Sequence, residues 1–262
     1  MFRKLFTLAA AVGLLLSAGE IARADANLKV GVSAGPYADI LRYAADLAAK
    51  EGIKAQIIEF TDWTQPNEAL NAGDLDLNNF QHVPYLNNQV KTRGYDIIPL
   101  AKTIIVPFGL YSKKVDKIAD IKDGATTAIP NDPSNGARGL QLLEKAGLIK
   151  LKPGADITAT IADIAENPKH LKIQELDAAQ LPRALDDLDF SVVSLNYAIN
   201  AGLDPKKALI LEDDQSKWNL VFAVKPKNKD NPAILRFVEI YRSEPVKEFI
   251  QKKFNGVILT TW

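Results

Sequence analysis

Short apolar runs alternate with amphipathic stretches along the chain from Asn27 onward. The first half predicts three strands, each followed by a helix: strands at 28–32, 55–60 and 75–80, and helices at 38–52, 66–72 and 84–94. The amphipathic stretches carry apolar residues at helical spacing, and each of them ends at a glycine. This alternating order of strands and helices implies a parallel sheet with right-handed crossovers.

The second half repeats the alternation. It predicts strands at 125–129, 171–175 and 190–195, a helix that runs to Lys145, a helical stretch at 178–187 and a final helical region at 232–254. Extended crossovers are expected near 104–112 and 218–224. We therefore expect an α/β protein of two lobes, the first formed by 27–107 with 222–262 and the second by 108–221. A cleft between two such lobes is a natural ligand site.

The first 26 residues have the pattern of a cleavable signal peptide. Arg3 and Lys4 precede an apolar run at 5–18 that is short for a membrane span, and small residues follow it. Cleavage is expected before Asp25 or before Asn27, and we favour Asn27. The sequence contains no cysteine, so it offers neither a disulfide nor a cysteine for lipid attachment. These features predict an exported protein without a lipid anchor.

The charge balance excludes some classes of partner. The chain has 32 basic and 32 acidic residues, and the predicted signal peptide takes away three of the first and two of the second. A chain near neutrality without runs of like charge has no electrostatic footprint for nucleic acid or for an anionic membrane surface. We expect neither as a partner.

An anion site is one interpretation of the stretch AIPNDPSNGARG. Asp132 is a good helix N-cap with Pro133 at the first helical position, which places Asn135 and Arg138 on one helix face. A helix N-terminus favours negative charge, and an arginine can hold a carboxylate with two parallel hydrogen bonds. The alternative is an arginine on a solvated helix face that pairs with a nearby Asp or Glu. The loop lacks the glycine spacing and lysine of a P-loop, so no nucleotide is expected, and no cofactor.

The stretch NNFQHVPY follows a predicted strand and suggests the wall of a pocket. Phe80, His82 and Tyr85 can project into the cleft beside Trp63 from the preceding loop, forming an apolar slot suited to a thioether or another uncharged side chain. The alternative is a core patch in which His82 is a satisfied polar member. A metal site is not expected, because His170 lies far along the chain and no second ligand stands at helical spacing.

Nucleophilic catalysis has little support. Ser134 and Ser194 lack the G-x-S-x-G elbow. A triad of His82, Asp132 and Ser134 would rest only on the presence of these residue types, because no motif links them. Asn196 and Asn219 each follow or open an apolar run and can hydrogen-bond an ammonium or a carboxylate, although each can equally cap a loop. We expect a binding protein without enzymatic activity.

Taken together, several motifs resemble the methionine-binding lipoprotein family of bacterial substrate-binding proteins, which feed an ATP-driven importer. They are VGVSAGP, QPNEAL, NFQHVPYL, GLYSKK, AIPNDPSNGARGLQLLEKAGLIKL, ENPKHLKIQELDAAQLPRALDD and the closing Trp262. The resemblance covers nearly all of the chain after residue 26. It implies a type II periplasmic-binding-protein fold with the ligand cleft between two lobes, a monomer in the periplasm, and an inner-membrane importer as partner.

The resemblance also implies the ligand and its contacts. The expected ligand is L-methionine or a close analogue, with Arg138 on its α-carboxylate, aromatic residues around its side chain and asparagines at its amino-acid end. The family's site falls on Trp63, Phe80, His82, Tyr85, Asn135, Arg138, Asn196 and Asn219. The family usually has a tyrosine in place of Trp63, so the slot can differ in depth.

The sequence leaves rival functions open. Within the same class, the ligand can be another amino acid, a methionyl dipeptide or another sulphur compound. From other classes, the rivals are a periplasmic hydrolase that uses His82 and a sensory subunit that presents its closed form to a receptor.

Overall fold

The computed structural model describes residues 26–213 and 217–262, so the predicted signal peptide lies almost wholly outside the described residues. The strands are β1 (Ala26–Ser33), β2 (Ile53–Phe60), β3 (Leu77–His82), β4 (Ile98–Ile105), β5 (Phe108–Tyr111), β6 (Thr126–Pro130), β7 (Lys150–Leu151), β8 (Ile164–Glu166), β9 (Lys172–Leu176), β10 (Phe190–Ser194), β11 (Ile210–Leu211), β12 (Asn219–Val224) and β13 (Leu259–Thr260). The helices are α1 (Pro36–Ala49), α2 (Gln65–Ala72), α3 (Val83–Arg93), α4 (Pro133–Lys145), α5 (Leu181–Ala184), α6 (Leu195–Asn200), α7 (Pro232–Tyr241) and α8 (Glu244–Phe254).

The first lobe is built on a six-stranded sheet with the order β13-β4-β12-β3-β1-β2. Its strands β2, β1 and β3 are parallel, which confirms the arrangement predicted for the first half of the chain. The other three strands pair antiparallel. Helices α1, α7 and α8 pack on one core of this sheet, and α2 and α3 on a second, smaller core.

The second lobe is built on a five-stranded sheet with the order β11-β5-β10-β6-β9. Strand β6 lies between two parallel neighbours, β9 and β10, and β5 pairs antiparallel with β10. Helix α4 belongs to one core of this sheet, whereas α5 and α6 belong to another. Each lobe therefore has a sheet between helices, the layering expected of an α/β unit.

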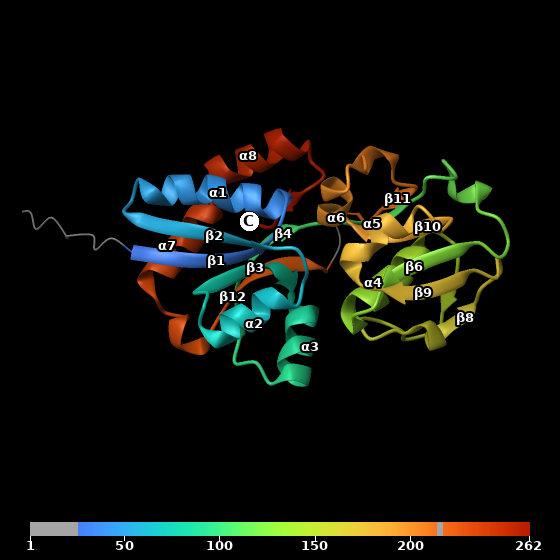
Figure 1. Cartoon of the computed structure of the whole chain (residues 1–262), viewed down its shortest axis with the longest axis horizontal. Coiled ribbons are helices and arrows are strands. Elements are labelled where there is room, and N and C mark those ends of the chain that lie inside the picture. Colours follow the sequence, from blue (N-terminus) through green and yellow to red (C-terminus); the bar gives the residue numbers. More distant parts are fainter. Residues whose placement is uncertain (1–25, 214–216) are drawn as a thin grey trace, which may run out of the picture.

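The two lobes lie side by side, and the chain passes between them twice (Figure 1). Only Val106 and Pro107 separate β4 of the first lobe from β5 of the second. The return passage runs from β11 to β12. The first passage lies within the crossover predicted near 104–112. The crossover predicted near 218–224 is wrong, because apart from Trp218 this stretch is strand β12 of the first lobe's sheet.

The predicted helical region at 232–254 divides into two helices. Helix α7 ends at Tyr241, and α8 begins at Glu244 with Pro245 in its first turn. A proline has no N–H to continue the first helix, and its ring would clash with the carbonyl four residues earlier. Among the described helices, none has the length and apolar character needed to cross a bilayer.

Candidate ligand-binding site

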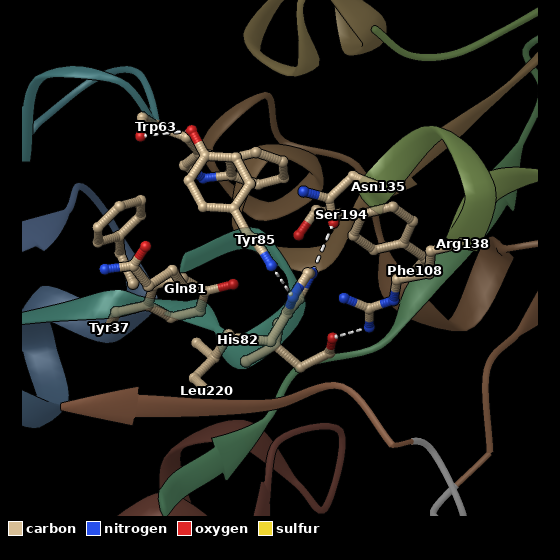
Figure 2. Close-up of a pocket in the computed structure, with 12 residues that line it drawn as sticks. Tyr37, Trp63, Gln81, His82, Tyr85, Phe108, Asn135, Arg138, Ser194 and Leu220 are labelled. Carbon is tan, nitrogen blue, oxygen red and sulfur yellow. Dashed lines mark hydrogen bonds between the residues drawn. The ribbon is translucent and has the colours of Figure 1, made fainter. Parts of the chain in front are cut away.

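A small cavity lies between the two lobes. Most of its wall is apolar or aromatic, and the polar groups come from both lobes. The lining residues are Tyr37, Trp63, Phe80, Gln81, His82, Tyr85, Val106, Phe108, Asn135, Arg138, Ser194 and Leu220 (Figure 2).

Six of the eight residues predicted for the site line this cavity, and two do not. Asn196 is fully buried behind the wall, where its Oδ1 accepts hydrogen bonds from Tyr37 (3.2 Å) and Ser194 (2.7 Å). Its Nδ2 has no hydrogen-bond partner among the described residues. Asn219 opens β12 opposite Ile105 of β4 and is not among the lining residues.

Three aromatic side chains form one wall of the cavity. The ring centroids of Trp63 and Phe80 lie 6.4 and 6.0 Å from that of Tyr85, both in edge-to-face arrangements. The Tyr85 hydroxyl donates to the Trp63 carbonyl oxygen at 2.8 Å, which fixes the loop against α3. Edge-to-face packing of this kind adds to the stability gained from burial alone. The wall is therefore rigid and apolar.

His82 is the N-cap of helix α3, a role that the sequence did not reveal. Its Nδ1 accepts from the backbone N–H of Tyr85 at 3.1 Å, so the ring proton is on Nε2, which donates to Asn135 Oδ1 at 3.0 Å. Burial, reinforced by the positive charge of Arg138, lowers the pKa of His82 to about 3. The ring is neutral near pH 7 and joins the first lobe to the second.

The hydrogen-bond chain continues from Asn135 to Asp132. Asn135 Nδ2 donates to the Asp132 carboxylate at 3.0 Å, and Asp132 caps α4 by accepting from the Asn135 N–H, as the sequence predicted. The Ser134 hydroxyl also donates to this carboxylate. Burial raises the pKa of Asp132, and the hydrogen bonds oppose that effect. The amide of Asn135 is thus held in one orientation at the cavity wall.

Arg138 is buried, and it both lines the cavity and pairs with an acid. Its Nε donates to a carboxylate oxygen of Glu212 at 2.9 Å, and its Nη2 donates to Glu212 and, at 2.8 Å, to the Val106 carbonyl. The guanidinium carbon lies 4.0 Å from the centroid of Phe108 and 5.4 Å from that of Trp218. Figure 2 shows the remaining nitrogen, Nη1, pointing towards the His82 side of the cavity. The expected pairing with an acid is therefore present, but on a buried and not a solvated helix face, and the anion site stays a prediction.

Further contacts hold the lobes together around the cavity. The ring of Trp63 in the first lobe packs 5.2 Å from that of Tyr197 in the second. Gly35 has φ +96°, and a Cβ there would overlap with the Asn200 side chain. Besides the bonds of His82 and Arg138, hydrogen bonds between described residues that cross the boundary include Tyr37 Oη to Asn196 Oδ1 (3.2 Å), Tyr197 Oη to the Thr61 carbonyl (3.2 Å) and Asn200 Nδ2 to the Ala34 carbonyl (3.0 Å). The lobes are closed on one another.

The sequence matches the family described as NlpA lipoprotein over residues 28–262. The chain belongs to the NlpA lipoprotein family. A relative from Pasteurella multocida, "Probable D-methionine-binding lipoprotein MetQ", is 43% identical over 238 residues, which cover 90% of this chain and 86% of the relative.

Solved structures of similar proteins share the fold. A nutrient-binding protein from Burkholderia cenocepacia bound to methionine is 49% identical, with a TM-score of 0.86 over 90% of this chain and 100% of that one. A periplasmic substrate-binding protein of an ABC transporter from Coxiella burnetii is 45% identical, with a TM-score of 0.86 over 89% and 100% of the two chains. The predicted two-lobed periplasmic-binding-protein fold is confirmed.

Both nitrogens of His82 are engaged by Tyr85 and Asn135, so the ring does not contact Ser134, whose hydroxyl donates to Asp132 instead. In the described part of the chain, no three His, Cys, Asp or Glu side chains cluster as metal ligands do.

The buried neutral His82 predicts a pH dependence of stability for this family member. The ring has a pKa of about 3 in the folded state against 6.5 as the usual value, so between these values the unfolded chain binds a proton that the folded chain does not. The stabilisation is complete above pH 6.5 and is lost as the pH falls towards 3. We expect urea unfolding at pH 7 and pH 4.5 to show about 2–3 kcal/mol less pH dependence in His82→Asn than in the wild type.

The chain offers a matched control for this measurement. Asparagine can still cap α3 at position 82. The exposed His170 has φ +50°, a conformation that asparagine tolerates well, so His170→Asn should keep the pH dependence of the wild type. Equal pH dependence in His82→Asn and the wild type would show that His82 titrates normally.

Proposed function

We propose that this protein is the substrate-binding component of an ABC importer and that it carries L-methionine or a close analogue in the cavity between its lobes. The observation that carries the proposal is a single buried cation, Arg138, whose Nη1 faces a cavity with an aromatic wall. An amino acid with an apolar side chain matches this combination of one anion-binding group and an apolar slot. The methionine bound to the Burkholderia relative supports the choice of ligand.

The amino-acid end of the ligand is proposed to lie beside the N-terminus of α4. Arg138 Nη1 binds the α-carboxylate, and Asn135 stands one helical turn away on the same face of α4. The hydroxyls of Tyr37 and Ser194 line the cavity and can accept a hydrogen bond from the ammonium. Asn196 contributes from behind the wall, where its Oδ1 accepts from both of these hydroxyls and orients them, and the role of Asn219 remains a prediction from the resemblance.

The side chain of the ligand is proposed to contact Trp63, Phe80, His82 and Tyr85. A thioether is polarisable, and contacts between its sulphur and aromatic rings are favourable by about 0.3–1.5 kcal/mol. The neutral His82 suits this slot because it adds no charge beside the side chain. Trp63 stands at a position where the family usually has tyrosine, so it is the residue most suited to adjust the depth of the slot.

Transport is proposed to follow from closure of the lobes on the ligand and recognition of the closed form by the importer. We assign 27–107 with 222–262 to one lobe and 108–221 to the other; the sheet memberships support this division, with β12 starting three residues before the second boundary. The protein is proposed to act as a periplasmic monomer, without catalysis. Its relatives are named lipoproteins, whereas this sequence has no cysteine to carry a lipid, and we propose that it is not lipid-anchored.

The proposed function predicts a recognisable ligand in the purified protein. Denaturation should release L-methionine or its analogue from the purified protein, and mass spectrometry of the released material identifies it. After removal of this ligand, L-methionine at one hundred times its Kd should stabilise the fold by about 2.7 kcal/mol, measured as a rise in melting temperature. D-Methionine, methionyl dipeptides and other apolar amino acids complete the panel.

The outcomes of this panel separate the rivals. If a dipeptide or another amino acid raised the melting temperature more than methionine does, that compound would be the ligand, and the binding function would stand. A panel in which nothing raises the melting temperature would contradict the proposal. Turnover of a dipeptide or ester that disappears in His82→Ala would favour a hydrolase.

A further inference from the structure

Glu212 is a carboxylate just outside the cavity that the proposed function does not use. It follows β11, and its side chain is 11% exposed beside that of Arg138, which is 3% exposed. Its carboxylate accepts from Arg138 Nε (2.9 Å), from Arg138 Nη2 and from the backbone N–H of Phe108 (2.8 Å). The backbone N–H of Glu212 in turn donates to the Phe108 carbonyl at 2.9 Å. Glu212 is thus fixed to the strand that begins the second lobe.

This pairing decides which part of Arg138 a ligand can reach. A guanidinium has five N–H donors on three nitrogens in a fixed plane. Nε and Nη2 are occupied by Glu212 and by the Val106 carbonyl, and none of the hydrogen bonds of the described residues uses Nη1. A carboxylate in the cavity therefore meets the Nη1 end of the fork.

The pairing also compensates the charge of the cavity. Among the lining residues only Arg138 carries a formal charge, since His82 is neutral. Glu212 cancels that charge within hydrogen-bond distance, and Asp132 is separated from the cavity by the amide of Asn135. A ligand with no net charge can enter this neutral site without leaving a buried charge uncompensated, whereas a ligand with only a carboxylate cannot.

We propose that Glu212 is a positioning residue that makes the site selective for zwitterionic ligands over simple carboxylates. It directs Nη1 into the cavity and neutralises the rest of the guanidinium, so that the site does not retain an anion lacking an ammonium. The inference rests on the proposed function, because it assumes that a ligand carboxylate meets Arg138. It adds a determinant of selectivity that does not touch the ligand, consistent with the principle that specificity depends on rejecting competitors as well as binding the partner.

The test compares L-methionine with 4-(methylthio)butanoate, its analogue without the ammonium group, by calorimetry. Removing the ammonium makes the analogue smaller, so it fits wherever methionine fits. We expect Glu212→Gln, which keeps the size but removes the charge, to shift the ratio of the two Kd values towards the analogue by at least tenfold. Glu212→Asp, which keeps the charge on a shorter side chain, should retain the wild-type ratio even if both ligands bind more weakly.

Each outcome bears on the proposal. Glu166→Gln is the control, because this glutamate is exposed and pairs with Lys150 on the surface of the second lobe. The ratio of the two Kd values in this variant should equal that of the wild type. If Glu212 only supported the fold, Glu212→Gln would weaken both ligands equally, and an unchanged ratio overturns the proposal. If Glu212→Gln does not fold, a Glu212→Asp ratio that moves away from the wild type overturns it as well. A wild-type protein that binds neither compound would instead contradict the proposed function.

Discussion

Arg138→Gln is expected to weaken the binding of L-methionine by about 2–5 kcal/mol, the range for losing one partner of a desolvated charge pair. In the affinity this is a loss of roughly 30-fold to several thousandfold. The reason is that Arg138 provides the one positive charge of the cavity wall, and the ligand's carboxylate would enter without a counter-charge. Isothermal titration calorimetry on ligand-free protein measures the change directly.

The choice of glutamine matters because of Glu212. Alanine at position 138 would leave the Glu212 carboxylate largely buried and unpaired, which is destabilising in itself. The amide of glutamine can still donate to that carboxylate while removing the charge. Arg93→Gln is the matched control: this arginine is 44% exposed, pairs with Glu68 on the surface, and should leave the affinity unchanged. An Arg138→Gln protein that binds methionine normally would place the carboxylate elsewhere.

Much of the fold could be predicted because its central elements carry strong local patterns. The parallel strands β1 to β3 and helices α1 to α4 have clear periodicity, with glycine or proline at their ends. The strands that were not predicted include β7, β11 and β13, which are two residues long and too short for any periodicity. Strand β4 was also missed, because most of it is only partly buried and lacks a regular alternation.

The direction of β12 illustrates a second limit of the sequence. Its apolar run predicted a crossover, whereas the structure places it antiparallel between β3 and β4 in the middle of the first sheet. The local sequence of a strand does not show whether its neighbours run parallel or antiparallel to it. The direction of β12 depends on the path of the chain through the second lobe before it re-enters the first sheet. The same return brings Leu220 to the cavity, which the sequence could not indicate.

The site was predicted best where one short stretch supplies several of its groups. Trp63, Phe80, His82 and Tyr85 lie within 23 residues of one another, and Asn135 and Arg138 share a helix face. These six residues do line one cavity. What sequence reasoning missed depends on contacts between distant residues: Glu212 reaches Arg138 across 74 positions. Position along the chain carries no signal for such a pair.

Gln81 shows why a polar residue at the wall is not automatically a ligand contact. It lines the cavity, yet its amide forms a reciprocal pair with Asn67, with both hydrogen bonds at 2.7 Å, and a further bond to Asn78 at 3.1 Å. All three residues are buried. A buried amide whose donors and acceptor are already satisfied gains little from a ligand, so Gln81 holds α2 against β3 beneath the aromatic wall.

Phe222→Ala is expected to lower the free energy of unfolding by about 3–5 kcal/mol, the range for truncating a buried phenylalanine. Phe222 lies on β12 with 0% of its surface exposed, and its ring meets those of Phe237 and Tyr241 edge to face, with centroids 6.2 and 5.0 Å away. The truncation leaves a cavity that the surrounding sheet and helices can fill only in part. Chemical denaturation of ligand-free protein gives the free energy of unfolding for the comparison.

The affinity for methionine should not change with this substitution. Phe222 belongs to the core of the first lobe and is not among the residues that line the cavity, so the folded fraction keeps its binding groups. Leu235→Ala on the neighbouring helix α7 is the control, because this leucine is 38% exposed and its truncation should cost less than about 1 kcal/mol. Arg138→Gln is thus expected to lower the affinity for methionine, and Phe222→Ala to lower the free energy of unfolding without changing that affinity. A Phe222→Ala protein of normal stability would mean that β12 is not packed between the helices as described, and the cavity wall that depends on β12 would have to be reconsidered with it.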